Sequence, residues 1–198
     1  YPFLFVLASR TATLHLRRPS LALLMIGIPL AYTAISSLRI APHQLAYFNE
    51  SIGGPEQGYR YLSDSNLDWG QDLKGLKAYI EREKLPIIYL SYFGTAPPAY
   101  YGIRYQDVAS KGALGPPPPE KVPADAPRKI LAISAYNLQD VSTADNPLFR
   151  WLWTRRPIAK IGYSIFIYDL SNDVPGLMML NALTREPALQ PCPAKPLH

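Results

Sequence analysis

The stretch SLALLMIGIPLAYTAISSL, residues 20–38, contains no charged side chain and is flanked by Arg17, Arg18 and Arg39. At about 1.5 Å of rise per residue, a helix of this length spans about 28 Å, close to the hydrocarbon thickness of a bilayer. Pro29 lies mid-stretch, where it kinks a membrane helix without excluding one, because neighbouring groups satisfy the freed backbone atoms. The stretch predicts a transmembrane helix, and a buried helix of a water-soluble protein is the alternative.

The residues before this stretch predict its orientation. Residues 1–9 are largely apolar and begin without Met, so we expect them to be the end of a preceding membrane helix in a longer protein. The loop at residues 10–19 carries no acid and four basic or titratable side chains, Arg10, His15, Arg17 and Arg18. Because basic loops stay in the cytoplasm, we expect residues 41–198 to lie outside it, in a multi-pass protein of the inner membrane.

Composition excludes several classes of function. The formal charge is +5, but part of it belongs to the loop at residues 10–19, so membrane lipid is an expected partner and nucleic acid is not. The single cysteine, Cys192, excludes a disulfide framework and a cysteine-ligated metal site. A second basic and aromatic cluster either contacts anionic head groups or forms a surface helix with buried tryptophans: Arg150, Trp151, Trp153, Arg155 and Arg156.

Residues 41–171 are expected to form one small α/β domain. Runs of branched and aromatic residues predict strands, and amphipathic spacing predicts helices, at alternating positions. This alternation favours a sheet of three or four strands covered by helices. The predicted strands are 59–62, 87–93, 129–136 and 161–170, and the predicted helices are 70–84 and 146–155.

Polar and Pro-rich residues delimit these elements. Asn146 is placed to cap the second helix, with Pro147 at its first position. Residues 95–105 are expected to be a loop with a short helical turn. Residues 112–127 include four consecutive prolines and are expected to be a polyproline-like insert. Residues 172–198 form a Pro-rich tail that is expected to be disordered.

The densest chemical signal is DSNLDWGQD, residues 64–72. Three interpretations stay open: capping of the helix that follows, contact with a ligand or sugar, and binding of a divalent cation. Asp64, Asn66 and Asp68 match the first three ligand positions of a calcium-binding EF-hand loop. The match then fails, because Trp69 replaces the turn glycine and Gly75 the bidentate glutamate.

Four segments carry a resemblance to a known family: APHQLAYFNE (41–50), GGPEQGYRYLSDSNLDWGQDLKGLKAYI (53–80), YFGTAPPAYYGI (92–103) and GYSIFIYDL (162–170). Their succession resembles the C-terminal part of bacterial integral-membrane glycosyltransferases similar to protein O-mannosyltransferases, glycosyltransferase family 39. The resemblance covers residues 1–170, without the Pro-rich insert and the tail. It implies a multi-spanning enzyme that moves a sugar from a polyprenyl-phosphate carrier to a glycan, lipid or protein acceptor on the outer side of the membrane.

The resemblance places the catalytic acid of such enzymes in an earlier outer loop, and no residue of this chain matches that motif. We therefore expect no catalytic residue here, no activity of this part alone and no cofactor bound to it, with a divalent cation left open for the full-length enzyme. Aromatic faces beside amides and carboxylates suit sugar binding, although tyrosines also build cores. The candidate substrate-binding residues are Asp64, Asn66, Asp68, Trp69, Gln71, Tyr100, Tyr101 and His43.

His43 and Asn49 either face a carrier phosphate or stabilise the junction between helix and domain. Three functions compete for the chain as a whole. The first is the accessory C-terminal domain of a lipid-carrier-dependent glycosyltransferase. The second is a membrane-anchored module that binds a glycan or protein without catalysis. The third is a cation-dependent hydrolase that uses residues 64–72, which the lack of a nucleophile motif disfavours.

Overall fold

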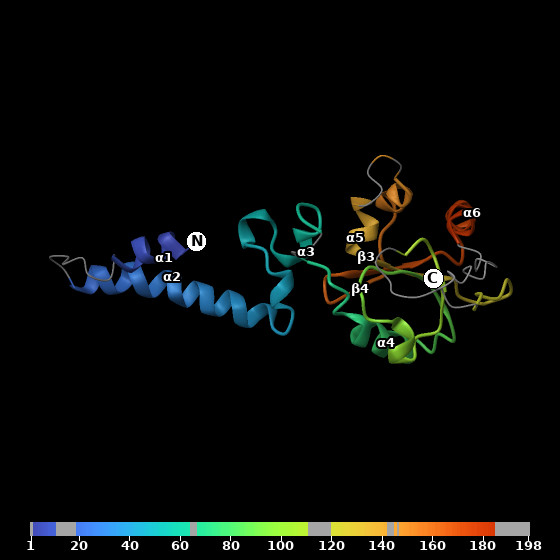
Figure 1. Cartoon of the computed structure of the whole chain (residues 1–198), viewed down its shortest axis with the longest axis horizontal. Helices are drawn as coiled ribbons and strands as arrows, with labels where there is room; N and C mark the ends of the chain where they lie inside the picture. Colours follow the sequence, from blue (N-terminus) through green and yellow to red (C-terminus); the bar gives the residue numbers. More distant parts are fainter. Residues whose placement is uncertain are drawn as a thin grey trace, which may run out of the picture. The chain divides into compact units, whose positions relative to one another are not determined.

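The structure is a computed structural model that describes residues 2–10, 19–63, 67–110, 120–141, 145 and 147–184 (Figure 1). The chain divides into two compact units, Tyr1–Gln44 and Leu45–His198. The first unit is helical and the second is an α/β domain with a five-stranded mixed sheet. The expected α/β class is therefore confirmed, whereas the expected count of three or four strands is wrong.

The N-terminal unit consists of two apolar helices, α1 (Pro2–Ser9) and α2 (Pro19–Ile40). Pro29 lies inside α2, and the Thr33 hydroxyl donates to the Pro29 carbonyl oxygen over 2.8 Å. The Leu23–Ile40 part is the one helix of the described residues that is long and apolar enough to cross a bilayer, with a mean hydropathy of 1.6. This finding is compatible with membrane association through α2. Of the expected cytoplasmic loop, residues 11–18 lie outside the described residues.

The sheet of the second unit has the strand order β2-β1-β3-β5-β4. Parallel pairs join β1 (Ile88–Ser91) to β2 (Tyr105–Asp107) and to β3 (Ile130–Ser134). Antiparallel pairs join β5 (Ile165–Asp169) to β3 and to β4 (Ala159–Ile161). The predicted strands at 87–93 and 129–136 are confirmed as β1 and β3. Strand β2 was not predicted: it begins at Tyr105, the last residue of the predicted loop at 95–105.

The predicted strand at 161–170 is confirmed in part, as β5 at Ile165–Asp169, whereas Ile161 ends β4 and residues 162–164 turn the chain between the two strands. Gly162 and Tyr163 have positive φ values of 55° and 72°, and the Ser164 amide donates to the Ile161 carbonyl oxygen over 3.2 Å. Positive φ at both central residues is the signature of the tight turns whose twist matches paired strands. The predicted strand at 59–62 is wrong. Helix α3 (Pro55–Gly58) ends just before it, and the amides of residues 60–62 donate to carbonyl oxygens of Gln57 and Gly58 in hydrogen-bonded turns.

Alternation along the strands creates two covered faces. Helix α4 (Leu73–Arg82) packs on one face, where its apolar side meets the sheet residues Ile88, Leu90, Ile130, Ala132, Ile165 and Ile167. Helix α5 (Ala135–Leu138) and the 3-10 helix η6 (Arg150–Thr154) lie on the opposite side of the sheet in Figure 1. Because neighbouring strand residues point to opposite faces, Phe166 and Tyr168 of β5 face this second side.

The helices predicted from the sequence agree only in part with those of the structure. The helix predicted at 70–84 is confirmed as the shorter α4, and the one at 146–155 is reduced to η6, with the proposed cap Asn146 outside the described residues. The helical turn predicted within 95–105 is confirmed as η4 (Pro98–Tyr101). Residues 120–127 of the Pro-rich insert contain no helix or strand, whereas 112–119 lie outside the described residues.

The tail that the sequence predicted to be disordered begins with a helix, α6 (Val174–Leu183), so that part of the prediction is wrong. Asp173 caps it by accepting a hydrogen bond from the Gly176 amide over 2.9 Å, with Pro175 in the first turn. Leu180 is fully buried, and Thr184 forms a bridge with Val108. Residues 185–198 lie outside the described residues.

Candidate functional site

The turn that precedes α4 contains a completely buried carboxyl group. Asp68 is 0% exposed and accepts hydrogen bonds from the amides of Gly70, over 3.1 Å, and of Tyr136, over 3.4 Å. Burial raises the pKa of Asp68 from 3.8 to about 7, because loss of water outweighs these donors and the Ser134 hydroxyl. Asp68 therefore stabilises the turn and connects it to the end of β3. Because its side chain is completely buried, a ligand at the surface does not contact it.

Asp72 makes a second connection from the same turn. Its carboxylate accepts a 2.7 Å hydrogen bond from the Ser164 hydroxyl in the β4–β5 hairpin. A Cβ atom at Gly162 would collide with that carboxylate, so the hairpin approaches it as closely as a glycine allows. Asp72 stands at the N-cap position of α4 but its side chain makes no capping hydrogen bond. The carboxylate thus joins turn and hairpin.

The other predicted residues of this turn are more exposed. Trp69 is 58% exposed, and its amide donates to the Gln71 side-chain oxygen over 2.8 Å, while Gln71 in turn donates to the Leu67 carbonyl oxygen over 2.9 Å. Asp64 and Asn66 lie outside the described residues. Among the residues that are described, no group of three His, Cys, Asp or Glu side chains is placed to hold a metal ion.

The remaining candidates lie elsewhere. Tyr100 is 81% exposed on η4 and packs edge-to-face on Tyr101, with ring centroids 5.3 Å apart, and Tyr101 contacts the core beneath α4. His43 belongs to the N-terminal unit, just after α2. Asn49 belongs to the α/β unit, where its side-chain oxygen accepts from the Ser51 hydroxyl. The structure therefore brings Asp68, Trp69 and Gln71 into one turn and places the tyrosine pair on a separate element.

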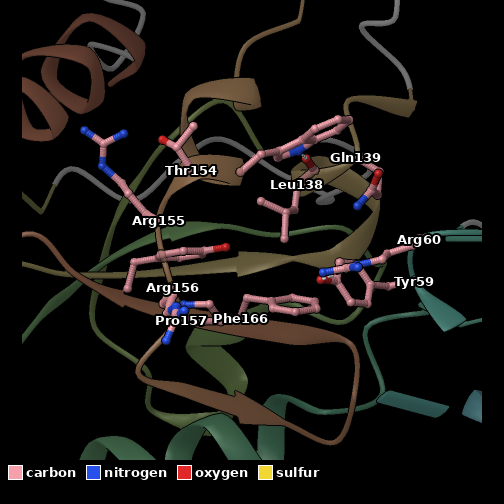
Figure 2. A pocket seen from close by; sticks show the side chains of 11 residues that line it. Tyr59, Arg60, Leu138, Gln139, Thr154, Arg155, Arg156, Pro157 and Phe166 are labelled. Atoms are coloured by element: carbon pink, nitrogen blue, oxygen red, sulfur yellow. Dashed lines mark hydrogen bonds between the residues drawn. The ribbon is translucent and has the colours of Figure 1, made fainter. Parts of the chain in front are cut away.

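The α/β unit contains a cavity of about 590 Å³ on the face of the sheet opposite α4 (Figure 2). This volume is within the range of about 300–1,000 Å³ that is typical of small-molecule sites. Figure 2 shows Leu138 and Phe166 directed toward one another across the cavity, with Tyr59 and Arg60 at one side. The lining residues are Tyr59, Arg60, Leu138, Gln139, Trp153, Thr154, Arg155, Arg156, Pro157, Phe166 and Tyr168. We call this cavity the arginine pocket.

The three arginines of the pocket have different partners, and only Arg155 among them pairs with an acidic side chain of the described residues. The Arg155 guanidinium pairs with both carboxylate oxygens of Asp173 and donates to the Trp151 carbonyl oxygen over 2.6 Å. It points out of the pocket in Figure 2. Arg60 donates to the hydroxyl of Tyr59 over 3.3 Å, and Arg156 is exposed at the rim. The described residues that line the cavity include three arginines and no acidic side chain, an arrangement that attracts anions.

Aromatic rings hold the walls in place. The Trp153 indole nitrogen donates to the Leu138 carbonyl oxygen over 2.9 Å, so η6 is fastened to α5. Tyr59 lies against Phe166 with ring centroids 4.7 Å apart, which joins the end of α3 to β5. The Lys160 ammonium group lies 5.2 Å from the Tyr59 centroid and forms an ion pair of 2.7 Å with Glu56. Elements from four parts of the chain therefore form one preorganised cavity.

No family model, curated protein or solved structure matches this chain. Functional inference therefore depends on the site geometry and on the sequence resemblance.

The sequence predicted no cavity, but it did indicate several residues of one wall of the arginine pocket. The cluster at 150–156 was singled out for its arginines and tryptophans, and Trp153, Arg155 and Arg156 line the cavity. Trp153 is 52% exposed, which contradicts the alternative of a surface helix with its tryptophans in the core. The opposite wall, Tyr59 and Arg60, was assigned to a strand, and Phe166 and Tyr168 to a buried one. Only strand pairing brings these residues opposite η6.

Proposed function

We propose that this chain is the membrane-anchored, extracytoplasmic α/β part of an inner-membrane glycosyltransferase that uses a polyprenyl-phosphate-linked sugar. In this proposal α2 is the last of several membrane helices, and the catalytic acid lies in a segment other than the one described. The α/β unit holds the donor or the acceptor near the membrane. Transfer from a lipid phosphate requires a base for the acceptor hydroxyl and positive charge for the departing phosphate.

The observation that carries this proposal is a set of contacts among three of the four segments that carry the family resemblance. Asp72 of the second segment binds Ser164 of the fourth, over 2.7 Å. Tyr92 of the third segment donates to the Gly70 carbonyl oxygen over 3.3 Å. A Cβ at Gly70 or at Gly94 would collide with the Tyr92 hydroxyl, so the two backbones meet where only glycine fits. Distant parts of the resemblance thus form one structural unit, as expected if the whole unit is shared with the family.

The test is sugar transfer by the complete reading frame that contains this chain. Membranes that carry it are incubated with radiolabelled polyprenyl-phosphate sugars, and transfer to an acceptor is measured. Trp69→Ala removes an exposed ring from the shared turn and should lower transfer with the amount of folded protein unchanged. Tyr61→Ala, which removes a ring that is 61% exposed outside that turn, is the matched control. Absence of transfer from every donor tested would refute the proposal.

A second candidate is a membrane-anchored module that binds a glycan or protein without catalysis. The arginine pocket favours it, because all of its lining residues belong to the Leu45–His198 unit and the site is complete without the membrane helices. The complete reading frame separates the two candidates. Further membrane helices with an acidic outer loop support the enzyme, whereas a start codon near Tyr1 supports the module.

A further inference from the structure

We infer that the arginine pocket binds a sugar that carries a phosphate group. The phosphate would lie between Arg60 and Arg156, and the sugar ring against the aromatic wall. This inference rests on the proposed function only for the source of the ligand, which is either the head group of a lipid-linked sugar or a soluble sugar phosphate.

The charge distribution determines where the anion binds. Asp173 neutralises Arg155 by a two-point contact and holds it away from the cavity, which makes Arg155 a positioning residue for η6. Arg60 donates to the neutral Tyr59 hydroxyl and lies over the Tyr59 ring, with its guanidinium carbon 5.7 Å from the centroid, and no acidic side chain of the described residues pairs with it. Arg156 lies at the rim on the segment that leaves η6. A planar guanidinium group binds phosphate oxygens through pairs of parallel hydrogen bonds. Because two such groups line a cavity whose described lining contains no acidic side chain, we expect the bound anion to be a phosphate.

The aromatic wall explains the preference for a ring. Trp153 is fixed through its indole nitrogen and by the Arg150 guanidinium, which lies 5.4 Å from its ring centroid, and it remains half exposed among the residues that line the pocket. Tyr59 is held in position by Phe166 on one side and by the Lys160 ammonium group. Rings that are already immobilised lose little conformational entropy when a ligand packs on them. Gln139, which is half-buried in the same wall, supplies an amide for the hydroxyl groups of a sugar.

The test is calorimetric titration of the full chain in detergent micelles with glucose 1-phosphate. Inorganic phosphate and glucose are titrated in parallel. We expect glucose 1-phosphate to bind at least tenfold more tightly than either, because the two halves of the ligand use different walls. Arg60→Gln and Arg156→Gln should each weaken binding about tenfold or more, since each removes a charge-assisted contact.

Arg104→Gln is the matched control: this arginine is paired with Glu120 outside the pocket, and its loss should leave binding unchanged. Equal binding of phosphate and glucose 1-phosphate would overturn the inference, as would equal losses in the pocket variants and in Arg104→Gln. Failure of the wild-type chain to bind glucose 1-phosphate or vesicles that carry a polyprenyl-phosphate sugar would also overturn it. Tighter binding of the vesicles identifies the lipid head group as the source, and equal or weaker binding identifies the soluble compound.

The two proposals fail in distinguishable ways. If the pocket binds glucose 1-phosphate but the complete protein transfers no sugar, the glycosyltransferase proposal is wrong and the binding site stands. If sugar transfer occurs and the Arg60→Gln and Arg156→Gln variants bind as the wild type does, the pocket inference is wrong and the proposed function stands.

Discussion

The buried carboxyl group of Asp68 makes the stability of the α/β unit depend on pH in an unusual direction. An exposed aspartate keeps its pKa near 3.8, whereas burial raises the pKa of Asp68 to about 7 in the folded chain. Between these values the folded chain keeps a proton that the unfolded chain has released. The contribution of Asp68 to stability is therefore full below about pH 4, is lost as the pH rises toward 7 and does not change further above that.

The size of the effect follows from the two pKa values. Proton linkage gives a loss of about 4 kcal/mol over the whole range, of which about 3 kcal/mol falls between pH 5 and pH 8. Asp68→Asn replaces the carboxyl group by a neutral group of the same shape, so the variant should show no such fall.

The assay is urea unfolding in detergent, followed by tryptophan fluorescence at pH 5 and pH 8. All three tryptophans, Trp69, Trp151 and Trp153, belong to the α/β unit, so the signal reports on this unit alone. We expect the free energy of unfolding of the wild type to fall by about 3 kcal/mol relative to Asp68→Asn over this interval. Parallel pH dependences of the two proteins would refute the assignment of the shift to Asp68.

Two further substitutions test the packing around the site. Gly162→Ala should destabilise the unit by about 1–3 kcal/mol more than Gly102→Ala. Both positions have positive φ, but only Gly162 lies against the Asp72 carboxylate. Similar melting temperatures of the two variants would contradict this. Leu76→Ala, at a fully buried position of α4, should lower the free energy of unfolding by about 2–5 kcal/mol, whereas Lys74→Ala on the exposed side should change it by less than about 0.5 kcal/mol. Urea titrations of both variants measure the difference.

Several elements could be predicted because the information that forms them is local. Helix α2 follows from hydropathy, α4 from apolar residues spaced along one side, and β1 and β3 from short branched runs. Strand β2 could not be predicted, because Tyr105–Asp107 has an ordinary sequence and becomes a strand only by pairing with β1. The β4–β5 hairpin escaped notice because its turn, Gly162–Tyr163, lacks the usual asparagine or aspartate before the glycine.

Local sequence also misjudged burial. The cluster at 64–72 has the composition of a solvated or ligand-binding loop, yet Asp68 and Asp72 are buried and bonded to residues 68 and 92 positions further along the chain. Hydrogen-bond donors at such separations cannot be assigned from sequence, because many arrangements of the intervening elements are compatible with it.

The sequence by itself determined that one uncharged apolar helix precedes a small α/β domain, because hydrophobicity and periodicity are properties of neighbouring residues. Tertiary structure alone decided which charges face a ligand. Arg60, Arg155 and Arg156 carry equal charges in the sequence, but pairing with Asp173 neutralises Arg155. The contact of Tyr59 with Phe166 and the segment that follows η6 place Arg60 and Arg156 beside an aromatic cavity. Electrostatic potential depends on distances in space, which the order of residues does not contain.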